Sequence, residues 1–164
     1  MKKRLLLIIV NLAVTFLLFM FGHSMTTKPG TSSGNGNPAI LLFVPLAILF
    51  VILVFQWVAL FKNTKLSRVQ IVILWLIIAG HFTIGISYQM MSYRKYRIFL
   101  SRVYEEKFGE IDWPYIKSIT SGLSIHINNQ YFNGNTFLLF VSLSLFIWGL
   151  YRMVKSAVKR RIDL

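Results

Sequence analysis

Four long apolar runs dominate this 164-residue sequence, and each is about as long as a helix that crosses a bilayer. The runs cover residues 5–22, 39–61, 69–90 and 137–154. About 20 residues, rising about 1.5 Å each, span a hydrocarbon core of about 30 Å. A helix on the surface of a soluble domain would carry a polar face, and these runs have almost none. The sequence therefore predicts four transmembrane helices.

The segments between the runs leave room for little else, so we expect residues 1–164 to form a single integral membrane domain. The fold class is then an all-α membrane protein, a four-transmembrane-helix bundle with a small extracytoplasmic cap. The other expected parts are an outer loop, a short link, the outer cap and a basic cytoplasmic tail, at residues 23–38, 62–68, 92–135 and 155–164. The short link favours a tight antiparallel hairpin between the second and third runs.

The distribution of cations predicts the orientation of the chain. The N-terminus, the link at 62–68 and the C-terminal segment carry 11 of the 18 Lys and Arg residues. Because such residues stay on the cytoplasmic side, we expect both termini in the cytoplasm, with the tail near anionic lipid of the inner leaflet. This placement accounts for the net charge of +13, so we expect no nucleic-acid partner. The Lys-, Ile-, Phe- and Asn-rich composition suits a protein of the bacterial cytoplasmic cell membrane.

The first apolar run has two interpretations. Residues 1–24 resemble a cleaved signal peptide, with Lys2–Arg4 as the basic start and Gly22 and Ser24 as small residues at the cleavage site. However, the run is long for a signal peptide, and Phe19 and Phe21 make it bulky near that site. We therefore expect an uncleaved transmembrane helix.

The segment 92–135 is patterned well enough to predict a folded cap. Apolar and charged residues alternate with helical spacing in 96–108, which predicts an amphipathic helix that continues the third run and ends at Gly109. Asp112 and Pro114 then mark the start of a second short helix, with Asp112 as N-cap. Alternating residues after Gly122 give a weak strand signal, so a β-hairpin is an option for 123–135.

Polar side chains within the spanning runs are the first candidates for a functional role, because they are costly in hydrocarbon. The candidates are His81, Asn11, Gln56 and Ser142. His81 could take part in proton chemistry or could hydrogen-bond across to another helix. Its potential partners are Asn11, Thr15, Gln56, Ser142 and Ser144. The spanning runs hold no carboxylate to complete a proton relay, so we favour a packing role.

The sequence offers little for catalysis or for a metal. It has no cysteine, which excludes disulfides, thiol nucleophiles and cysteine-ligated zinc. His23 and His126 are both expected on the outer side, yet only tertiary contact could unite them in a metal site. Glu105 and Glu106 lie on a charged helix face, and no G-x-S-x-G, H-E-x-x-H or Walker-type motif occurs. We therefore expect no enzyme, no catalytic, metal or cofactor site, and no cofactor.

These observations favour a non-enzymatic accessory or regulatory protein that acts on another membrane component through helix contacts and the cap. The expected partners are the lipid bilayer and a membrane protein or a second copy of the chain. Five cap residues are candidates for the partner-facing surface: Phe99, Tyr104, Trp113, Tyr115 and His126. A subunit of a small channel or transporter is the alternative, and a membrane enzyme using His126 or His81 is the third class.

Overall fold

The computed structural model describes residues 2–31, 36–64 and 66–162, and all regular structure in these ranges is helical. Four helical segments are long and apolar enough to cross a membrane. They are α1 (Lys2–Ser24), the 3₁₀ helix η1 (Pro38–Leu42) joined to α2 (Phe43–Leu60), α3 (Arg68–Phe108) and α6 (Gly134–Ile162). The prediction of an all-helical chain with four candidate spans is confirmed.

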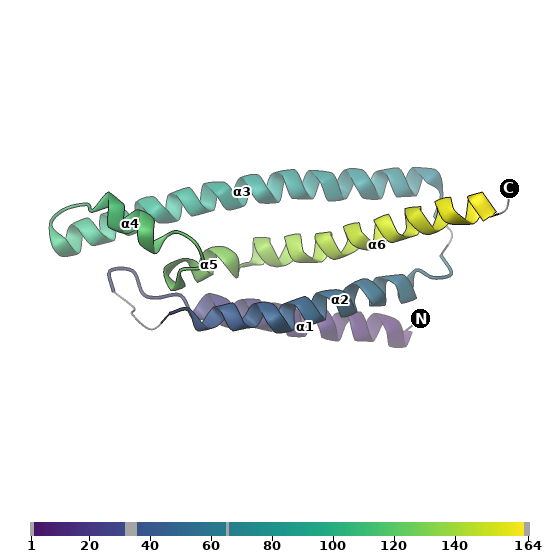
Figure 1. Cartoon of the computed structure of the whole chain (residues 1–164), viewed down its shortest axis with the longest axis horizontal. Helices are drawn as coiled ribbons and strands as arrows, with labels where there is room; N and C mark the ends of the chain where they lie inside the picture. The colour runs from purple at the N-terminus through teal and green to yellow at the C-terminus, as the bar shows by residue number, and fades with distance from the viewer. Residues whose placement is uncertain (1, 32–35, 65, 163–164) are drawn as a thin grey trace.

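Helix α6 lies at the centre of the arrangement (Figure 1). It packs against α2 on one side and α3 on the other, while α1 packs mainly against α2. The expected tight hairpin between the second and third runs is therefore wrong, because α6 separates α2 from α3. Aromatic side chains explain this order, since Trp148 of α6 packs at a tilt against Phe61 at the end of α2, and Phe146 of α6 meets Trp75 of α3 edge to face.

The two ends of the bundle are formed by different parts of the chain. Both termini lie at one end, together with the link between α2 and α3 (Figure 1). The segment 92–135, which we call the cap, lies at the other end beside the loop that follows α1. Within the basic tail, α6 continues to Ile162, whereas the side chains from Lys159 to Arg161 lie outside the described residues.

Helix α3 is unusually long for a membrane span. Its 41 residues correspond to about 60 Å, or about twice the thickness of a hydrocarbon core. It begins with a capping box between Ser67 and Gln70 and ends at Gly109, which has a left-handed φ of 86°. One continuous helix therefore joins the membrane span to the cap.

Three short helices complete the described part of the cap. Helix α4 (Trp113–Ile119) begins where expected, because the Asp112 side chain accepts a hydrogen bond from the backbone N–H of Tyr115. The β-hairpin expected as an option for 123–135 does not form. Residues Ile125–Ile127 form the 3₁₀ helix η2, and Asn128–Tyr131 form α5. The Ser124 hydroxyl caps η2 by accepting from the N–H of His126, so the backbone is satisfied locally without a partner strand.

The buried core is concentrated at the capped end of the bundle. One cluster joins α1, η1, α2 and the end of α5 through Phe19, Leu42, Leu46 and Phe132, and Phe137 and Phe140 of α6 pack against it. A second cluster inside the cap unites Leu100, Tyr104 and Ile116. Elsewhere, the spanning helices expose apolar side chains, and only 11% of the most apolar window of α3 is buried. Such a surface suits lipid rather than water.

Candidate functional site

Two of the predicted intramembrane residues, Asn11 and Gln56, join α1 to α2. The Asn11 amide Nδ2 lies 3.0 Å from Gln56 Oε1 and 3.2 Å from the carbonyl oxygen of Leu49. Gln56 Nε2 in turn donates to the carbonyl oxygen of Leu7 at 3.2 Å. Asn11 is buried, and Thr15 donates to its Oδ1. This closed set of hydrogen bonds leaves no free group for chemistry, which favours a packing role.

The other two predicted residues, His81 and Ser142, join α3 to α6. His81 Nδ1 lies 2.9 Å from Ser142 Oγ, and both side chains are half-buried. Two residues further along α6, the indole Nε1 of Trp57 donates to Ser144 Oγ at 2.9 Å and ties α2 to the same helix. Each of these contacts links α6 to a neighbour, and none of them brings His81 near Asn11 or Gln56.

The cap residues predicted to face a partner divide into two groups. Phe99 and Trp113 are exposed at 49% and 42%, and Tyr115 is half-buried. Tyr104 and His126 are buried, which corrects the expectation that they face a partner. Tyr104 packs against Leu100 and Ile116, and His126 Nδ1 has no hydrogen-bond partner in the part of the chain that the structure describes. Burial lowers the pKa of the His126 imidazole below its usual value.

The loop after α1 is tied to the cap by side chains. Tyr104 donates from its hydroxyl to the carbonyl oxygen of Thr31, and Lys107 Nζ donates to that of Gly30. Further along, Asn37 and Asn128 exchange amide hydrogen bonds of 2.7 and 3.0 Å. The Gly/Ser/Asn/Pro-rich loop is thus fixed to the cap at Gly30 and Thr31 and again at Asn37.

An amide network fastens α3 to α5 and the start of α6. Gln89 of α3 is its centre, since its Nε2 donates to the Gln130 carbonyl oxygen at 2.7 Å. Its Oε1 accepts from Asn133 at 3.3 Å and from Asn135 at 3.1 Å. Asn135 also donates to the carbonyl oxygen of Gly85. These bonds connect residues more than 40 positions apart and set the separation of α3 from α6.

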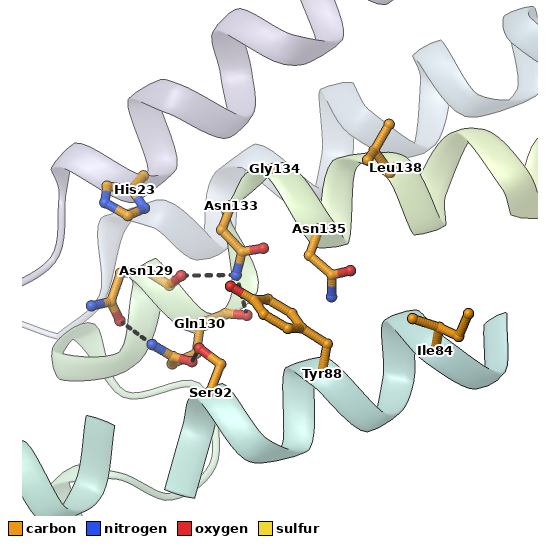
Figure 2. A pocket seen from close by; sticks show the side chains of 10 residues that line it. All are labelled: His23, Ile84, Tyr88, Ser92, Asn129, Gln130, Asn133, Gly134, Asn135 and Leu138. Carbon is orange, nitrogen blue, oxygen red and sulfur yellow. Dashed lines mark hydrogen bonds between the residues drawn. The ribbon is translucent and has the colours of Figure 1, made fainter. Parts of the chain in front are cut away.

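A groove of about 610 Å³ lies beside this network (Figure 2). Its lining comes from the end of α1, the middle of α3, α5 and the start of α6. The lining residues are His23, Ile84, Tyr88, Ser92, Asn129, Gln130, Asn133, Gly134, Asn135 and Leu138. Volumes of this size are typical of small-molecule sites. Of the three histidines considered from the sequence, His23 lines this groove, whereas His81 and His126 are not among its lining residues.

The described residues hold no cluster suited to a metal ion. In the ranges 2–31, 36–64 and 66–162, no three His, Asp or Glu side chains come together as metal ligands. His23 donates from Nδ1 to the Phe132 carbonyl oxygen at 2.8 Å, whereas His126 is buried inside the cap. Comparisons with family models, curated proteins and solved structures gave no match.

Sequence reasoning missed the groove and the network around Gln89. The asparagines at 128–135 indicated turns, and Gln89 fell near the end of an apolar run. A signal was nevertheless present, because Ile84, Tyr88 and Ser92 are spaced four residues apart and share one face of α3. This face changes from apolar to polar along the helix.

Proposed function

We propose that this chain is a non-enzymatic accessory or regulatory protein of a cell membrane, with both termini in the cytoplasm. It acts on another membrane protein through the surface of α3 and through the exposed side of the cap. The bias of Lys and Arg toward the N-terminus, the link and the C-terminal segment supports this orientation.

The single observation that carries the proposal is the position of α3. Among the described residues, α6 is the one spanning helix with which α3 makes extensive contact, and α3 continues without a break into the cap. The face opposite α6 carries Gly80, Thr83 and Ser87, all exposed. Small residues let a second helix approach closely, so this face suits helix association.

The cap adds a second exposed surface beyond the membrane. Phe99 lies on the part of α3 within the cap, and Trp113 begins α4. Both aromatic rings are exposed, although the cap has an apolar interior in which they could have been buried. Exposed aromatic side chains are common anchors in protein interfaces. A partner that follows α3 would contact membrane and cap surfaces together.

Site-specific photocross-linking in native membranes tests the proposal. A photoreactive amino acid is placed at Thr83 and, in a separate variant, at Phe99. The matched control places it at Phe55, an exposed residue on the lipid-facing side of α2. We expect the same membrane protein to be cross-linked from Thr83 and Phe99 but not from Phe55.

Two results would contradict the proposal. Cross-links to lipid alone from all three positions would leave α3 without a protein partner. Cross-links only to a second copy of the chain would indicate a homo-oligomer, such as a channel subunit, instead of an accessory protein.

A further inference from the structure

The lining of the groove between α1, α3 and α6 changes from apolar to polar along its length. On α3, Ile84, Tyr88 and Ser92 line it in succession, so its wall runs from an aliphatic side chain through a phenol to a hydroxyl. On the opposite side, Leu138 is followed toward the cap by Asn135 and Gly134. Figure 2 shows the aliphatic residues at one end and the amides at the other. A lipid has the same order, with acyl chains next to a polar head group.

The position of the groove supports this comparison. Its apolar end lies within the spanning parts of α3 and α6, whereas its polar end meets α5 of the cap. Helices α1 and α3 flank it, and the main contacts of α3 are with α6, α4 and α5 rather than with α1. The groove is therefore open between these two helices toward the surrounding lipid.

The polar end is held in place before any ligand binds. Ser92 donates to Gln130 Oε1 at 3.1 Å, and Gln130 Nε2 donates to Asn129 Oδ1 at 3.3 Å. Asn133 Nδ2 donates to the Asn129 carbonyl oxygen at 3.0 Å. Together with the bonds of Gln89, these contacts fix the shape of the wall. A fixed wall lowers the cost of ordering when a ligand binds.

The groups that line the polar end carry no formal charge. None of the lining residues is Asp, Glu, Lys or Arg. His23 donates from Nδ1 to a carbonyl oxygen, and in a neutral imidazole the other ring nitrogen, Nε2, is then an acceptor. Tyr88 lines the groove with an exposed side chain whose hydroxyl can donate or accept. Neutral donors and acceptors of this kind match hydroxyl groups better than a phosphate, which binds to Arg and Lys.

We propose that this groove binds a membrane lipid of the leaflet next to the cap, with an uncharged head group rich in hydroxyls. A glycosyl diacylglycerol has this chemistry, with acyl chains along Ile84 and Leu138 and the sugar beside Tyr88 and the amides. The proposal does not depend on the proposed partner surface, because Gly80, Thr83 and Ser87 are not among the residues that line the groove.

Native mass spectrometry of the full chain, released from nanodiscs of defined composition, tests the proposal. The nanodiscs contain monoglucosyl diacylglycerol, phosphatidylglycerol and phosphatidylethanolamine with the same acyl chains. We expect the glucolipid to be retained about tenfold more often than either phospholipid. Equal retention of the three lipids, or preference for phosphatidylglycerol, would overturn the proposal.

Two groove variants and one control variant test whether the glucolipid binds in the groove. Tyr88→Phe removes one hydroxyl and should weaken glucolipid binding about fivefold, the usual effect of one lost hydrogen bond. Ile84→Trp should fill the apolar end and reduce binding about tenfold. The matched control is Ile77→Trp, because Ile77 is also an exposed isoleucine of α3 but does not line the groove. Unchanged binding in Tyr88→Phe and Ile84→Trp would show that the lipid sits elsewhere.

Discussion

Gly22 marks a place where α1 meets the cap with no room for a side chain. A Cβ at this position would lie 2.5 Å from Cγ of Phe132 and within 2.8 Å of both Cδ atoms. Carbon atoms in ordinary contact are about 3.5–4.0 Å apart, so Gly22→Ala forces the ring to move. Phe132 is only 1% exposed and packs against Phe19 and Phe43, at ring separations of 5.9 and 5.5 Å. The ring therefore has little space to move into.

Two opposing effects set the size of the change. Overfilling a packed core costs about 1–3 kcal/mol, whereas replacing a helical glycine by alanine gains about 0.5–1 kcal/mol. We therefore expect Gly22→Ala to lower the free energy of unfolding by about 1–2 kcal/mol, or Tm by about 2–8 °C for a chain of this length. Gly80→Ala is the matched control, because nothing lies within 4 Å of its added Cβ. It should leave Tm unchanged or raise it slightly.

The two variants are compared by thermal unfolding in mild detergent. Unfolding is measured as the loss of the monodisperse peak in gel filtration. The result that would refute this reasoning is a Gly22→Ala protein as stable as Gly80→Ala. It would show that the end of α1 does not pack on Phe132. The described contact between α1 and the cap would then be wrong.

Three other predictions concern buried polar groups. In a double-mutant cycle, Asn11→Leu and Gln56→Leu should show a coupling of about 0.6–2 kcal/mol, since their amides bond directly; additive effects would contradict a direct contact. His81→Ala should lower Tm by a few degrees, corresponding to about 1 kcal/mol, yet leave cross-linking from Thr83 intact. Unchanged Tm with lost cross-linking would assign His81 a functional role instead. Burial lowers the pKa of His126, so the unfolded cap binds a proton more readily than the folded one. Cap stability should be constant above about pH 6.5 and fall as pH drops toward the lower folded pKa, which limited proteolysis at about pH 7.5 and 5.5 measures. His126→Gln should remove this dependence, and an equal dependence in that variant would contradict it.

Local chemistry explains why much of the fold could be predicted from the sequence. The spans follow from the length of apolar runs, and helix ends follow from single residues such as Gly109 and Asp112. Each of these signals acts within a few residues of the backbone that it shapes. The continuation of the third helix to Phe108 was predicted for the same reason, since its apolar positions kept a helical period.

Contacts between distant segments could not be predicted in this way. The pairing of Gln89 with Gln130 and Asn135 depends on how α6 enters beside α3. The short link favoured contact between the second and third runs, but the aromatic contacts of Trp148 and Phe146 place α6 between them. The alternation after Gly122 indicated a strand, yet the Ser124 cap makes a helical turn there. In each case a single sequence gives the residue types without the neighbours that decide their role.

The most direct test of the four-span arrangement uses the absence of cysteine from this chain. Single-cysteine variants at Asn63, Ser121 and Lys155 place one thiol in the link, in the cap and near the C-terminus. A membrane-impermeant maleimide is then applied to intact cells and to inverted vesicles. We expect Ser121→Cys to react only in cells, and Asn63→Cys and Lys155→Cys to react only in inverted vesicles. Labelling of Ser121→Cys and Asn63→Cys from the same side would contradict the four-span arrangement.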